Sequence, residues 1–137
     1  MTPVDPGLPH REPFVFVDEI LERKAGEFAR CKKTFPKDAD FFRGHFPGNP
    51  IVPGVLLTEA LAQTAGIAAA NDEPGSQFLL SAIRSMKFPK AARPDEVITL
   101  EARKLGEMGG LLQFEVRAHV ADSTIAEGTL ILNTARS

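Results

Sequence analysis

A histidine in a turn and a glutamate on the helix that follows are the residues best suited to chemistry. His45 lies in the segment 44–54, GHFPGNPIVPG, which contains three prolines and three glycines. Glu59 is the only ionisable residue of the apolar stretch 54–70. Proline-rich backbone can hold an imidazole in place, and an apolar helix favours the uncharged form of a carboxyl group. The pair therefore predicts acid and base catalysis.

Two interpretations of Glu59 are open at this point. A charge on an apolar helix is costly if it is buried alone, so the carboxyl group must be paired, protonated or placed at a cavity wall. Gln63 follows one turn later on the same helix face, where its amide could hold and orient Glu59. The alternative is that Glu59 lies at the solvent edge of the helix, and spacing alone favours neither.

His45 also has a simpler interpretation, because a single histidine in a turn is more often a surface or packing residue. Three phenylalanines lie near it in the sequence, Phe41, Phe42 and Phe46. Apolar walls of this kind would favour the neutral imidazole that a general base requires. His10, in a proline-rich arm, and His119, in an alternating strand, are interpreted as structural.

Pro53 and Gly54 open the predicted helix. The first N–H groups of a helix have no partner within it and lie at the positive end of its dipole. They could therefore hold a carbonyl oxygen that gains charge during a reaction. A simple helix-start turn is the alternative.

The elements that position these residues follow from the periodicity of the sequence. Residues 54–70 predict one core helix about 25 Å long. Apolar–polar alternation and β-branched residues predict strands at 27–35, 78–88, 97–104, 111–120 and 124–133. Breakers at 106–110 and 121–123 are short enough for hairpins, residues 14–21 fit either helix or strand, and a short helical turn is expected at 41–42. One long helix wrapped by an antiparallel sheet is an α+β architecture, the hot-dog arrangement.

The composition describes an ordinary globular domain. The chain has 137 residues, of which 43% are hydrophobic and 25% charged, and we expect one domain, 1–137, with 1–9 as a flexible arm. The net charge of −2 gives no overall attraction to nucleic acid or to an anionic membrane. Stretch 54–70 is too short and too polar for a membrane span, and no signal peptide is recognisable at the N-terminus.

The single cysteine, Cys31, excludes an intrachain disulfide and a cysteine-based zinc site. Asp5, Asp18 and Asp40 show no metal-ligand spacing with any histidine. No phosphate-binding loop or dinucleotide fingerprint is present. We therefore expect a cytoplasmic protein that binds no metal.

Three segments of the chain resemble the FabZ-type (3R)-hydroxyacyl-[acyl-carrier-protein] dehydratases of fatty acid biosynthesis. Residues 8–18 are similar to the family's LPHRYPFLLVD motif, residues 44–63 to its GHFPxxPxMPGVLxxEAxAQ signature, and residues 125–130 to its VAEAEL pattern. Glu59, where an aspartate would resemble the related FabA dehydratase/isomerase, favours FabZ. Glu12 departs from the family's tyrosine, and residues 86–96 match only loosely the segment that shapes its acyl tunnel.

The resemblance implies a hydro-lyase that converts (3R)-hydroxyacyl thioesters to trans-2-enoyl thioesters without a metal or organic cofactor. His45 falls on the family's catalytic histidine and Glu59 on its catalytic glutamate. Gly54 falls on the amide that holds the thioester carbonyl, and Gln63 on the orienting glutamine. The residues expected along the acyl tunnel are Phe46, Pro53 and Val55.

The resemblance also implies partners. The family is a hot-dog homodimer, usually assembled as a trimer of dimers, whose sites join the histidine of one subunit to the glutamate of the other. An acidic acyl carrier protein delivers the substrate on phosphopantetheine, and basic residues near the tunnel mouth could contact it. The candidates for that contact are Arg84, Lys87, Lys90 and Arg93.

Other functions stay open beside fatty acid synthesis. One is the same dehydration in a dedicated pathway of the polyketide or polyene type. Another is a non-catalytic hot-dog subunit that only binds acyl chains, although intact His45 and Glu59 argue against it. A thioesterase explains the histidine, the glutamate and the oxyanion site less well.

Overall fold

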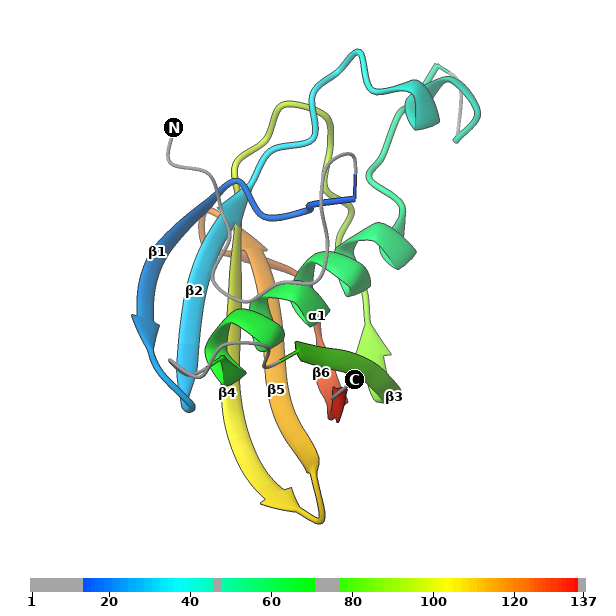
Figure 1. Cartoon of the computed structure of the whole chain (residues 1–137). Helices are drawn as coiled ribbons and strands as arrows, with labels where there is room; N and C mark the ends of the chain where they lie inside the picture. The colour runs from blue at the N-terminus through cyan, green and yellow to red at the C-terminus, as the bar shows by residue number, and fades with distance from the viewer. Residues whose placement is uncertain (1–13, 46–47, 71–76, 136–137) are drawn as a thin grey trace.

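One helix packed on a six-stranded antiparallel sheet forms the body of the protein (Figure 1). The computed structural model describes residues 14–45, 48–70 and 77–135. The helical elements are the short 3-10 helix η1 (Asp40–Arg43) and the long helix α1 (Gly54–Ala69). The strands are β1 (Glu19–Lys24), β2 (Phe28–Lys33), β3 (Gln77–Lys87), β4 (Ile98–Met108), β5 (Leu111–Val120) and β6 (Ser123–Ala135). The predicted α+β hot-dog architecture is confirmed, and the arm predicted at 1–9 lies outside the described residues.

The sheet has the strand order β1-β2-β4-β5-β6-β3 and curves around α1 (Figure 1). Both predicted hairpins are present, joining β4 to β5 and β5 to β6. Gly109 and Gly110 connect the first pair with φ angles of 57° and 84°, the left-handed values that a tight hairpin turn requires. Strand β3 pairs only with β6 and β1 only with β2, so these two strands are the edges of the sheet.

The predicted ranges differ from the observed elements most clearly at two places. The strand expected at 97–104 continues to Met108, because a bulge between Lys104 and Gly106 lets the ladder pass the glycine that was expected to end it. Residues 14–21 form a strand only from Glu19 onward. The residues before it run as irregular chain whose backbone bonds to a side chain of α1, as described below.

Helix α1 is buried almost all round, as its apolar sequence predicts. Its C-terminal carbonyl groups are capped from β1, since Arg23 Nε donates to Ile67 O at 2.9 Å and Arg23 Nη2 donates to Ala70 O. The amide of Gly26 donates to Ala68 O at 2.7 Å. A cation and an amide thus satisfy the negative end of the helix. In the described part of the chain, no helix is long and apolar enough to cross a membrane.

The two faces of the sheet differ in polarity. Residues that face α1 are buried, including Leu100, Phe114 and Leu130. The intervening residues face outward and are largely polar, which explains the alternation that predicted these strands. The core therefore lies between one sheet face and the helix.

Cys31 is a fully buried core residue of β2, and its thiol should not react while the protein is folded. Burial raises the pKa of Cys31 from 9.0 to about 12, partly offset by a hydrogen bond with Thr64. The thiolate fraction should then be about a thousandfold lower than in the unfolded chain. We expect a thiol-specific reagent to modify native protein far more slowly than protein in denaturant, and equal rates would contradict this burial.

The same shift has a consequence for stability against pH. The folded state keeps the thiol proton at pH values where the unfolded chain, with its pKa near 9.0, has lost it. This contribution is therefore fully present below pH 9 and is lost as the pH rises toward 12. Replacing Cys31 with alanine should flatten the alkaline limb of a plot of unfolding temperature against pH.

Candidate functional site

Gln63 joins Glu59 to the chain segment that precedes β1. Its side chain is 1% exposed, and its Nε2 donates to Glu59 Oε2 at 3.0 Å and to Phe14 O at 3.1 Å. Its Oε1 accepts from the amide of Phe16 at 2.8 Å. Because both ends of the amide are occupied, the side chain has one orientation, with a donor facing the carboxylate. The bond to Glu59 is the one that the helical spacing predicts.

Glu59 lies between the two environments considered from the sequence, the apolar core and the solvent edge of the helix. It is half-buried, whereas its helix neighbours Thr58 and Ala60 are buried. Its carboxyl group is therefore at the boundary of the apolar core and is held there by Gln63. This arrangement can present a proton or a charge to a group that approaches from outside the core.

The N-terminus of α1 carries unpaired donors. Pro53 is the N-cap residue, and the amides of Leu56 and Leu57 donate to Pro53 O at 3.0 Å and 3.2 Å. Among the described residues, the amides of Gly54 and Val55 donate to no acceptor. They point along the positive end of the helix dipole, where an oxygen that gains negative charge would be stabilised.

His45 is half-buried and follows Gly44, the C-cap residue of η1. The chain around η1 extends beyond the sheet (Figure 1). The helical turn expected at 41–42 is confirmed by η1. The rings of Phe41 and Phe42 pack at 4.5 Å between centroids, and Phe41 also meets Phe35 at 5.8 Å. These aromatic contacts anchor the chain that leads to His45.

Residues after β3 hold the other end of the histidine segment. The amide of Val52 donates to Ala92 O at 2.8 Å, and Ala92 is fully buried. Arg93 donates from Nη1 to Asn49 Oδ1, also at 2.8 Å. Residues 49–53 are therefore tied to the loop that follows β3 as well as to α1.

Of the predicted site residues, the helix groups three: Gly54, Glu59 and Gln63. His45 lies on the preceding segment, Pro53 is half-buried at the N-cap, and Val55 is 76% exposed. Phe46 lies outside the described residues. Among those described, no cluster of histidine, cysteine and acidic side chains has the make-up of a metal site. His119, interpreted as structural, lies near Glu101 at 3.4 Å and contacts Ala121 O at 3.0 Å.

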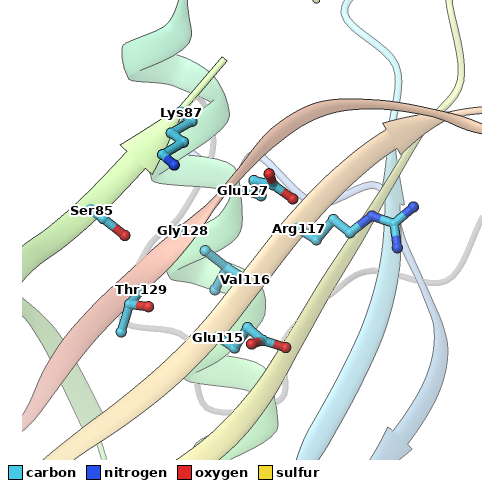
Figure 2. Close-up of a pocket in the computed structure, with 8 residues that line it drawn as sticks. All are labelled: Ser85, Lys87, Glu115, Val116, Arg117, Glu127, Gly128 and Thr129. Atoms are coloured by element: carbon cyan, nitrogen blue, oxygen red, sulfur yellow. The ribbon is translucent and has the colours of Figure 1, made fainter. Parts of the chain in front are cut away.

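A polar pocket of about 420 Å³ lies on the outer face of the sheet, turned away from α1 (Figure 2). Lys87 of β3, Glu127 of β6 and Arg117 of β5 follow one another across its strands. Glu115 adds a second acid, so the pocket holds two acidic and two basic side chains. With two acids and two bases, the pocket has no preference for an anionic or a cationic ligand. The sheet lies between this pocket and the groups on α1.

The four basic residues suggested for a carrier contact do not form one uniform patch. Lys87 lines the outer pocket beside the two acids, and Arg84 is exposed on β3. Lys90 donates to Ser123 Oγ at 3.4 Å, and Arg93 is engaged with Asn49. Lys90 and Arg93 therefore already make hydrogen bonds to other segments of the chain.

Two features of the site were not predicted from the sequence. The backbone of Phe14 and Phe16 supplies the other partners of Gln63, and the ring of Phe88 lies against Gly54. The partners of Gln63 lie 47 and 49 residues away along the chain. No local pattern marks a backbone group as the partner of so distant a side chain.

Replacing Gln63 with leucine should lower both stability and activity. The variant removes the acceptor of the Phe16 amide, and leaving a buried donor unsatisfied costs about 1–3 kcal/mol. It also frees Glu59 to rotate. Gln113→Leu is the matched control, because Gln113 is a half-buried outer-face residue with no hydrogen bond to its side chain among the described residues. Thermal unfolding should separate the two variants, and equal unfolding temperatures would contradict the network.

Comparisons with known proteins agree with this geometry. The family model described as ApeI dehydratase, ApeI-like, matches residues 21–129. A "3-hydroxyacyl-[acyl-carrier-protein] dehydratase FabZ" from Ruminiclostridium cellulolyticum is 42% identical over 125 residues, which cover 90% of this chain and 88% of the relative. A protein of the same name from Chloroflexus aggregans is 39% identical over 126 residues, with 90% and 88% covered.

Among solved structures, the ApeI:P dehydratase heterocomplex from Xenorhabdus doucetiae contains a chain with a similar fold. The TM-score is 0.79 at 18% identity, and the match covers 100% of this chain and 93% of the other. At that identity the likeness concerns the fold alone.

Proposed function

Because the chain belongs to the family of FabZ and ApeI-like dehydratases, and is therefore a 3-hydroxyacyl-[acyl-carrier-protein] dehydratase, we propose that His45 and Glu59 carry out its elimination. The observation that most supports this assignment is the hydrogen bond of 3.0 Å from Gln63 to Glu59. It fixes a carboxyl group at the edge of an apolar core, five residues after the unpaired amide of Gly54.

The reaction needs a base, an acid and a stabilised thioester oxygen. His45 takes the proton from the α-carbon, and the electrons of that C–H bond form the new double bond. The bond from the β-carbon to the hydroxyl oxygen breaks, and the leaving group takes the proton of Glu59 and departs as water. Acid and base assistance of this kind contributes about 10²–10⁴-fold.

The Gly54 amide would hold the thioester oxygen while charge builds on it. Its N–H lies at the positive end of α1 and has no acceptor among the described residues. Losing one such donor costs roughly 10²–10³-fold in well-studied enzymes. Beside it, the proposed acyl tunnel would use Pro53, the exposed Val55 and Phe46.

A homodimer is the assembly that we propose for this site. Strand β3 is an edge strand of 11 residues with apolar side chains exposed to solvent, namely Leu79 at 55%, Leu80 at 38% and Ile83 at 52%. An exposed, apolar edge is unusual unless another chain covers it. The other edge, β1, is short and charged, which is how proteins protect an edge that stays free.

Within such a dimer, His45 of one subunit would face Glu59 of its partner. A trimer of dimers is the larger assembly that we propose, and mass measurement in solution tests it. The alternative is that the chain serves a dedicated pathway or pairs with a different subunit. Copurification of a second hot-dog chain would favour that alternative over a homo-oligomer.

An acyl carrier protein is the proposed partner, docked through basic residues that include Arg84, Lys87, Lys90 and Arg93. These residues are proposed because their positive charge complements an acidic carrier. Such complementarity mainly raises the rate of association. We also propose a cytoplasmic location, which suits a chain whose single cysteine, Cys31, is a buried free thiol.

The proposed function is tested with 3-hydroxyacyl thioesters of increasing chain length on acyl carrier protein. We expect interconversion with the 2-enoyl thioester, followed by the ultraviolet absorbance of the conjugated product. The preferred chain length would separate general fatty acid synthesis from a dedicated pathway. Absence of turnover at every length would leave the acyl-binding, non-catalytic subunit as the function.

A further inference from the structure

The contact between Phe88 and Gly54 is an unexplained feature of the proposed thioester site. Phe88 follows directly after the end of β3, more than thirty residues from the start of α1. A Cβ atom on Gly54 would lie 3.1 Å from both Cε1 and Cζ of the Phe88 ring and 3.4 Å from Cδ1. The ring therefore lies tightly against the space that a side chain at position 54 would enter.

The backbone around Phe88 is firmly held. Lys87 is paired with Glu127 at the end of the ladder between β3 and β6. Pro89 follows, and a residue before proline is restricted to extended conformations. The ring thus extends from a fixed point toward the N-terminus of α1.

The packing of the fold does not account for this ring. Phe88 is 46% exposed, and it is not among the buried side chains of the core. Its contact with Gly54 is instead at the N-terminus of α1, where the amides of Gly54 and Val55 have no acceptor among the described residues. The amide nitrogen and the Cβ position are both bonded to the same Cα atom, so the ring flanks whatever binds the Gly54 N–H.

From this geometry, and on the premise that the Gly54 amide holds the thioester oxygen, we propose that Phe88 is a positioning residue for the substrate. Its ring forms an apolar wall beside the amide and limits the directions from which a carbonyl oxygen can reach it. It also favours glycine at position 54, because a Cβ atom there would require the ring to give by a few tenths of an ångström. Exposed on its other side, the ring is available to the substrate itself.

The test is a double-mutant cycle with Gly54→Ala, Phe88→Ala and the combined variant. Phe88→Ala should lower kcat/KM by roughly tenfold or more, since small misplacements of a reacting group have effects up to about 10²-fold. As a single substitution, Gly54→Ala keeps the amide but shifts the ring by a few tenths of an ångström, so it should lower activity. In the combined variant the clash is absent, and the loss should be smaller than the product of the two single losses.

Controls separate positioning from folding. Leu105→Ala removes a side chain that is 52% exposed on β4, far along the chain from these groups, and should leave kinetics unchanged. Phe88→Leu, which keeps an apolar wall, should recover part of the loss in kcat/KM. Multiplicative losses in the double variant, or Phe88→Ala kinetics equal to those of Leu105→Ala, would overturn the inference. Failure of the proposed function is a separate outcome, because unaltered protein would then turn over no thioester.

Discussion

His45→Ala protein and Glu59→Gln protein should each be nearly inactive, and their mixture should regain activity. Each substitution removes one proton-transfer group, for which we expect a loss of about 10²–10⁴-fold in kcat. Gln at position 59 keeps the size of the side chain, so Gln63 and the surrounding helix stay packed. The losses should therefore come without a comparable fall in unfolding temperature.

The recovery follows from the proposed shared site. A mixed dimer carries one site with both native groups and one site with neither. If subunits exchange at random, half of the dimers are mixed, so activity should reach about one quarter of the native value. Exchange is followed by mass spectrometry of a tagged and an untagged chain.

The control for His45→Ala is a histidine whose removal should leave kcat unchanged. His119→Ala serves, because His119 contacts Ala121 O and Glu101 on the outer face of the sheet. It should keep native kcat. If exchange is complete and the mixture stays inactive, histidine and glutamate act within one chain, and the dimer model of the site is wrong.

Gly128→Ala should strongly destabilise the fold. Gly128 lies on β6 opposite Met86, and a Cβ atom there would be 2.0 Å from Ser85 O and 2.6 Å from Met86 Sδ. The first of these is backbone and cannot move without breaking the pairing of β3 with β6. Overpacking of this kind costs about 1–3 kcal/mol and more where backbone must shift, so we expect a fall in unfolding temperature of roughly 10 °C.

Gly106→Ala is the matched control in another strand of the same sheet. Gly106 has no heavy atom within 4 Å of its Cβ position and no left-handed φ angle. Alanine there should be neutral or slightly stabilising, because it restricts the unfolded chain. Equal unfolding temperatures for the two variants would show that the β3 edge can relax. A large loss at Gly128 should also weaken association, since it distorts the strand that we propose as the dimer edge.

Local patterns predicted the elements of this fold well. The apolar run 54–70 became α1, the alternating strands became β2 to β6, and the double glycine became the turn between β4 and β5. The prediction was wrong at Gly106, where a glycine was expected to end the strand. The strand continues through a bulge, and whether a bulge forms depends on the pairing with the neighbouring strand. The family resemblance, with its fold and its dehydratase reaction, was confirmed by the comparisons.

Some contacts of the site could be predicted from the sequence and others could not. The pairing of Gln63 with Glu59 was predictable, because residues four apart on a helix are neighbours whatever the rest of the chain does. The bonds from Gln63 to the Phe14 and Phe16 backbone were not, and neither was the ring of Phe88 against Gly54. These contacts join segments that only the packed sheet and helix bring together.

By itself, the sequence determined which groups are available: an imidazole on a proline-stiffened turn, a carboxyl group on an apolar helix, and a glycine at that helix's first position. Periodicity and turn chemistry act over a few residues, so they set elements and residue types. Only the tertiary structure decided how these groups are held, with Gln63 orienting Glu59 from a buried position and Phe88 closing the space at Gly54. Such contacts depend on the order of strands in the sheet and on the exclusion of atoms from one another, which no short stretch of sequence encodes.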